Sequence, residues 1–141
     1  MTRALPNEAN TLMANGSLSP LLPAPRVLLI EDEYLIAVMV ADMVADLACE
    51  CIGPILTMEE GIKAAKSVVC DAAIINLIIQ GRYAYEITEI LADRSIPFCF
   101  ASGVPQAEID EKWRSRPFIA KPYTLENVSD FLLAVLPSWS R

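Results

Sequence analysis

Short apolar runs alternate with longer amphipathic segments along the chain from Arg26 onward. The runs are compact and rich in branched residues, which is typical of strands buried on both faces of a parallel sheet. The pattern predicts strands at residues 26–30, 49–55, 71–77, 96–102 and 117–120. The segments between and after them predict helices at residues 34–47, 57–67, 83–93, 106–113 and 124–136, the fourth of which is short and weak.

The borders of these segments fit helix starts and a layered fold. Thr57-Met-Glu-Glu60 has the form of a capping box, and Thr124 stands where it can cap the last helix. Strands that alternate with helices form a parallel sheet with helices on both faces. Such a doubly wound α/β sheet places its site at the carboxyl ends of its strands. The residues directly after each apolar run are therefore the candidates for chemistry.

The first 25 residues have a different character. They combine prolines with Asn, Ser, Thr and Gly, and such a segment buries too little surface to offset its ordering entropy. We expect a flexible N-terminal arm over residues 1–25, one domain over residues 26–137 and a C-terminal tail over residues 138–141. The apolar residues 18–22 leave open that the arm docks on a neighbouring surface.

Length, charge and the absence of histidine narrow the classes of function. A chain of 141 residues suits one domain with a hydrophobic core. The net charge of −7 does not fit a nucleic-acid-binding protein, and no apolar stretch approaches the roughly 20 residues of a membrane span. We therefore expect a cytoplasmic protein without nucleic-acid or membrane partners. Because the chain has no histidine, Ser-His and Cys-His catalysis are excluded.

The cysteines Cys49, Cys51, Cys70 and Cys99 lie in apolar segments and lack the paired spacing of a zinc site. Reduced core cysteines of a cytosolic protein are the simpler interpretation. A redox pair of Cys49 and Cys51 stays open, because alternate residues of a strand lie on one face.

Polar residues with related chemistry stand at the ends of four predicted strands. Glu31 and Asp32 follow the first strand, Asn76 lies near the end of the third, Ser102 ends the fourth and Lys121 follows the fifth. The carboxyl ends of parallel strands share one edge of a sheet, so these side chains should converge on one pocket. Each has a simpler interpretation alone, since acidic residues favour a helix start and serine before glycine is an ordinary turn residue. Their order and spacing together favour a functional site.

This constellation resembles the receiver domain of two-component signalling, over residues 26–136. The resemblance implies a flavodoxin-like fold with a five-stranded parallel sheet in the order 2-1-3-4-5. It implies that Glu31 and Asp32 hold Mg²⁺ together with position 76 and the backbone carbonyl of Ile78. Mg²⁺ prefers such hard oxygen ligands and keeps several waters.

The other matched positions concern the phosphoryl group. Ser102 matches the hydroxyl that binds the phosphoryl group in the active state, and Lys121 matches the lysine that pairs with the acceptor and the phosphoryl oxygens. Phe118 matches the aromatic switch position. Pro122 follows Lys121 as in the family, and a cis bond is expected between them. The resemblance implies no enzyme activity but a signalling partner, a histidine kinase or another signalling protein.

Asn76 is the main departure from the family pattern, which has an aspartate nucleophile at this position. The nitrogen of an amide is delocalised and its oxygen is uncharged, so neither attacks phosphorus, and a negative Mg²⁺ ligand is lost. We therefore predict an atypical single-domain receiver with weakened Mg²⁺ binding that is not phosphorylated at Asn76 and acts by protein–protein interaction. The alternative is a conventional phospho-accepting receiver in which mutagenesis replaced the aspartate. A third hypothesis is an unrelated enzyme or flavin binder. The sequence disfavours it, because no Gly-rich phosphate loop follows the first strand.

Two further features concern partner binding. Phe98-Cys-Phe-Ala-Ser-Gly103 resembles the Phe-Ala-Thr-Gly signature of an alphaproteobacterial receiver subclass, and the space before Arg116 allows only a shortened fourth helix. The predicted helix at residues 34–47 is apolar nearly all round, beyond the stripe of about 100° that a buried face needs. The last helix is similarly apolar. A patch across these two helices could bind a partner or form a homodimer, unless the arm around residues 18–25 covers it.

Overall fold

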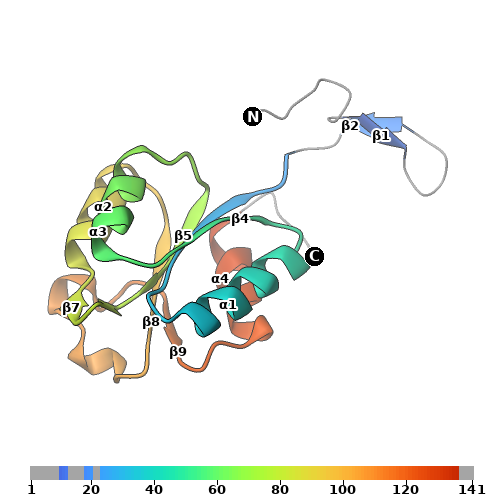
Figure 1. Ribbon diagram of the computed structural model, residues 1–141. Coiled ribbons are helices and arrows are strands. Elements are labelled where there is room, and N and C mark those ends of the chain that lie inside the picture. Colours follow the sequence, from blue (N-terminus) through green and yellow to red (C-terminus); the bar gives the residue numbers. More distant parts are fainter. Residues whose placement is uncertain (1–9, 13–17, 21–22, 137–141) are drawn as a thin grey trace.

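Five parallel strands form the central sheet of the computed structural model, which describes residues 10–12, 18–20 and 23–136 (Figure 1). The predicted doubly wound α/β fold is confirmed, because the first of these strands in the chain lies between the second and the third. The central strands are almost wholly buried, which explains their unbroken apolar runs. From one outer strand to the other the order is β4 (Glu50–Ile55), β3 (Arg26–Ile30), β5 (Ala72–Asn76), β8 (Phe98–Ser102) and β9 (Phe118–Ala120).

Helices cover both faces of the sheet (Figure 1). One face carries α1 (Tyr34–Asp46) and α4 (Leu125–Val135), and the other carries α2 (Met58–Ser67) and α3 (Tyr85–Asp93). Within the described residues, none of the helices has the length and apolar character that crossing a membrane requires.

Alternation along the strands divides the interior into two cores. In β3, Val27 and Leu29 face α1 and α4, whereas Leu28 and Ile30 face α2 and α3. The helix starts follow the sequence prediction: the Thr57 hydroxyl accepts a hydrogen bond from the amide of Glu60, and the hydroxyl of Thr124 caps α4 in the same way. Apart from the fourth helix, the ends of helices and sheet strands lie within two residues of the predicted ones.

The predicted fourth helix at residues 106–113 is reduced to two 3-10 turns, Gln106–Glu108 and Glu111–Trp113. Neither residue between the turns has a helical backbone, and that of Ile109 is extended, which interrupts any longer helix. The segment is held by aromatic packing instead, since the ring of Trp113 lies 5.7 Å from that of Phe98. The shortening expected from the subclass resemblance therefore goes further than a short α-helix.

The loop predicted after the third strand is a tight hairpin of β6 (Ile78–Ile79) and β7 (Arg82–Tyr83). Its two turn residues, Gln80 and Gly81, have φ of 52° and 79°, as a two-residue hairpin turn of type I′ requires. The hairpin takes up Tyr83, so the third helix starts two residues later than predicted.

Near the start of the chain, β1 (Asn10–Leu12) pairs with β2 (Leu18–Pro20) in antiparallel orientation. The rest of the predicted arm, apart from residues 23–25, lies outside the described residues, as does the predicted tail at residues 138–141. Both remain predictions.

Candidate functional site

Glu31, Asp32, Asn76 and Lys121 form one hydrogen-bonded cluster at the carboxyl edge of the sheet. The Nδ2 atom of Asn76 lies 3.0 Å from Oε2 of Glu31 and 2.9 Å from Oδ1 of Asp32. The Nζ atom of Lys121 lies 2.9 Å from Oε1 of Glu31. These four side chains, which the sequence predicted to converge, do meet.

Strand register explains why the cluster forms. Ile30 of β3 lies opposite Ile75 of β5, so the next residues along these neighbouring strands, Glu31 and Asn76, come side by side. On the other side, Ser102 lies opposite Ala120, which brings Lys121 to the same edge. The peptide bond between Lys121 and Pro122 is cis, as expected.

Glu31 is the buried centre of the cluster, with an exposed fraction of 0%. Its Oε2 accepts hydrogen bonds from Asn76 and from the backbone amide of Glu33, and its Oε1 accepts from the hydroxyl of Tyr123 at 3.1 Å and pairs with Lys121. A carboxylate removed from water needs such partners. Burial, and next the charge of Glu31, raise the pKa of Tyr123 far above its usual value, so its hydroxyl stays protonated and donates.

Asp32 is held by the hairpin. Its Oδ2 accepts a hydrogen bond of 2.8 Å from the backbone amide of Gln80. The side-chain oxygen of Gln80 accepts in turn from the amide of Met58 at the start of α2. Gln80 therefore connects the acidic pair to the start of α2.

Two residues of this network, Tyr123 and Gln80, are not predicted by the sequence pattern. Tyr123 could have been found, since it follows Lys121 by two residues at the same edge. Gln80 offers a weaker indication, because its contact depends on the turn that it forms with Gly81.

Three other predicted site residues make no hydrogen bond to the cluster among the described residues. Ser102 is buried, and its hydroxyl accepts from the amide of Val104, which is the ordinary role of a turn serine. Ile78 belongs to the hairpin and pairs with Tyr83. Phe118 lies in β9, half-buried.

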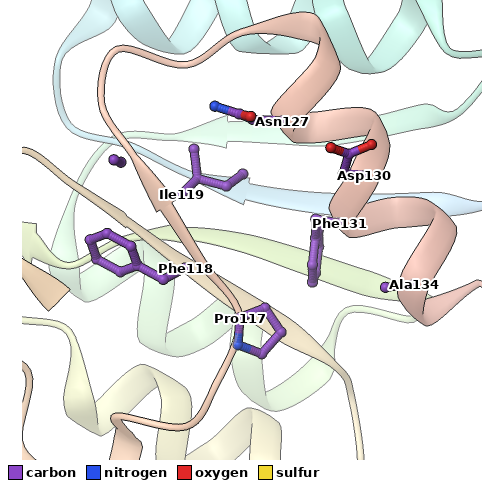
Figure 2. A pocket seen from close by; sticks show the side chains of 8 residues that line it. Pro117, Phe118, Ile119, Asn127, Asp130, Phe131 and Ala134 are labelled. Carbon is purple, nitrogen blue, oxygen red and sulfur yellow. The ribbon is translucent and has the colours of Figure 1, made fainter.

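Phe118 also lines an open groove of about 530 Å³ between β9 and α4 (Figure 2). Figure 2 shows Phe131 and Asp130 on the helix side of this space, whereas the ring of Phe118 lies on the other side of the strand and packs against the core beneath α2 and α3. The groove is mainly apolar and contains none of the acidic cluster, so it suits contact with another molecule better than chemistry.

Comparison with known proteins gives no match to a protein-family model and none to a curated protein. Solved structures do match. The CheY-like receiver domain protein of Methanospirillum hungatei JF-1 has a TM-score of 0.71 at 14% identity, covering 81% of this chain and 94% of that one. SdrG from Sphingomonas melonis Fr1 is 33% identical with a TM-score of 0.71, covering 80% of this chain and 97% of SdrG. This chain belongs to the response-regulator receiver family.

Another receiver domain, that of the sensor histidine kinase PA1611 from Pseudomonas aeruginosa PAO1, is described with a magnesium ion coordinated in its active-site cleft. It matches at 16% identity with a TM-score of 0.66, covering 82% of this chain and 99% of its own. The family thus implies a Mg²⁺ site.

The arrangement in this receiver does not fit that ion. Each carboxylate oxygen of Glu31 and Asp32 already accepts a hydrogen bond or pairs with Lys121. Asn76 turns its NH₂ group, which is a donor, toward both carboxylates. Across the described part of the chain, no group of three His, Cys, Asp or Glu side chains is placed to hold a metal. Mg²⁺ requires oxygen ligands in near-octahedral geometry, which these side chains do not present.

Proposed function

We propose that this receiver is not phosphorylated at Asn76 and acts by binding another signalling protein. The supporting observation is the amide at the end of β5, which donates to both members of the acidic pair. Its nitrogen has no free lone pair, so it cannot replace the carboxylate nucleophile that the family uses. Asp71 does not substitute for it, because Asp71 precedes β5 and binds the amide of Arg26 at the opposite end of the strand.

The other site residues fit this proposal as remnants of a phosphoryl-transfer pocket. Lys121 pairs with Glu31 and lies 3.8 Å from Glu33, so its charge is already engaged. The Ser102 hydroxyl accepts a hydrogen bond within its own turn, and the ring of Phe118 packs against the core beneath α2 and α3. Loss of the third carboxylate also weakens any Mg²⁺ site at this position.

The proposed partner surface lies on α1. Its outward residues Tyr34, Leu35, Val38 and Met39 are apolar and exposed, and Leu35 is 81% exposed. A helix that only covers a sheet needs one apolar stripe, so these exposed apolar residues exceed what packing on the sheet requires. Receiver domains interact with histidine kinases and other signalling proteins. We assign this surface to such a partner, or to a second copy of the chain joined through α1 and α4.

Acetyl phosphate separates the proposal from conventional phosphotransfer. The wild-type chain and the variant Asn76→Asp are incubated with acetyl phosphate and MgCl₂, and intact mass is measured before and after hydroxylamine treatment. The wild type should gain no phosphoryl group, whereas the variant should gain one that hydroxylamine removes. Stoichiometric labelling of the wild type overturns the proposal. The variant Asp71→Asn serves as a control for labelling at the other end of β5.

A further inference from the structure

We infer that the side-chain amide of Asn76 takes the place of the divalent cation in this pocket, so that the receiver keeps its acidic pair together without metal. The inference rests on the proposed function and adds to it, because it says how the pocket is stabilised when neither phosphate nor Mg²⁺ regulates it. It concerns the two carboxylates of Glu31 and Asp32 and the groups that hold them.

The geometry of Asn76 is that of a bridge. One NH₂ group lies 3.0 Å from Glu31 and 2.9 Å from Asp32, so each of its two hydrogens points to a different carboxylate. The opposite orientation of the amide would place its oxygen against two carboxylate oxygens, which repel it. Aspartate at this position has no hydrogen to donate when ionised, so it cannot make this bridge.

The remaining acceptor positions are filled by the chain itself. Lys121 and Tyr123 bind Oε1 of Glu31, and Gln80 binds Oδ2 of Asp32. Buried charges are tolerated when each is paired and hydrogen-bonded, and here that condition is met with protein groups alone. A cation entering the pocket must displace these donors and also turn the amide of Asn76 round.

The charges of the described cluster favour the same conclusion. Glu31 and Asp32 carry two negative charges, and Lys121, whose side chain is only 16% exposed, carries one positive charge. An aspartate at position 76 adds a negative charge, and therefore increases both the repulsion within the cluster and its attraction for a divalent cation. The single change from carboxylate to amide therefore has two effects. It lowers the repulsion that a bound cation would offset, and it weakens the attraction of the pocket for that cation.

The test measures Mg²⁺ binding directly. Wild-type protein labelled with ¹⁵N is titrated with MgCl₂ into the millimolar range at constant ionic strength, and the side-chain NH₂ resonances of Asn76 are followed. We expect them to stay in place, and thermal unfolding to show no shift in Tm. Saturable movement of these resonances, with a rise in Tm, overturns the inference because the amide then acts as an oxygen ligand.

The variant Asn76→Asp, purified with MgCl₂ present, is the matched comparison. It should unfold at a lower temperature than wild type in metal-free buffer and regain several degrees with MgCl₂. If neither protein responds to Mg²⁺, the pocket is closed for a reason other than the amide, and the inference is wrong. If the wild type binds Mg²⁺ but takes no phosphate from acetyl phosphate, the inference fails while the proposed function stands.

Discussion

The acidic pocket and the outer face of α1 are neighbours in the chain, since Asp32 and Tyr34 are two residues apart. Their side chains nevertheless have opposite environments. In the pocket, buried polar groups find partners within the same chain. On α1, large apolar groups face outward without cover from the described helices and sheet. The pocket therefore contributes to the stability of this receiver, whereas the described residues place no cover over the apolar outer face of α1.

Removing Lys121 should give the largest change in stability. The variant Lys121→Met leaves the carboxylate of Glu31 buried without its cation, and breaking such a pair costs about 3 kcal/mol. Urea unfolding measures the loss. The control is Lys112→Met, which breaks the exposed ion pair with Glu89 and should cost less than about 1 kcal/mol. Equal losses in the two variants contradict the role given to the pocket.

Substitutions on the two sides of α1 should give the next largest difference in stability. Val40 is fully buried, and Val40→Ala should lower the free energy of unfolding by roughly 2 kcal/mol through lost burial and the cavity left behind. Val38, two residues away, is exposed, and Val38→Ala should change stability by less than about 0.5 kcal/mol. A similar loss in both variants means that the outward face is covered in the folded protein.

Cys99 is a buried ionisable group without a partner of opposite charge in the described part of the chain, and it should make the stability of the protein depend on pH. Burial raises the pKa of the Cys99 thiol far above its ordinary value of 9.0. The unfolded chain therefore releases this proton near pH 9 while the folded chain keeps it. Stability from this thiol is complete below that pH and falls by up to about 1.4 kcal/mol per pH unit above it.

The measurement compares urea unfolding of the wild type and Cys99→Ala between pH 8 and pH 10. Loss of stability with rising pH should be less steep in the variant, whatever its absolute stability. Cys51, whose pKa burial raises to about 11, titrates in the same direction and remains in both proteins. Parallel slopes show that the Cys99 thiol ionises alike in the folded and unfolded chains.

Leu35→Glu should have the smallest effect on folding and a clear effect on association. The side chain is 81% exposed, so the free energy of unfolding should change by less than about 0.5 kcal/mol. Binding to a kinase partner, or self-association measured by light scattering, should be lost because a charge enters the apolar surface. Lys63→Glu, on the exposed side of α2, is the control and should leave association intact.

The fold and the main members of the cluster could be predicted because they depend on strand periodicity and strand order. Apolar runs located the sheet, and Glu31, Asn76 and Lys121 followed from their places at strand ends. Simple geometric rules connect such positions to one edge. Cys49 and Cys51, for which the sequence left a redox pair open, are both free thiols in the structure.

What could not be predicted depends on local backbone conformation and on competition between partners. The contact of Gln80 with Asp32 requires a left-handed turn that the sequence indicates only weakly. The family resemblance predicts that Lys121 pairs with the acceptor position, residue 76, but Lys121 pairs with Glu31, which is fully buried and carries a carboxylate. The weak helix at residues 106–113 gave way to 3-10 turns because aromatic packing, rather than helix propensity, holds that segment.

The outer strands of the sheet have a consequence for how copies of this protein can meet. Pro54 lies within β4, and Pro117 and Pro122 bracket the three residues of β9. Proline lacks an amide hydrogen, so an outer strand that contains proline or is flanked by it is a poor template for strand addition. Both borders of the sheet are therefore unfavourable for edge-to-edge pairing with a strand of another copy.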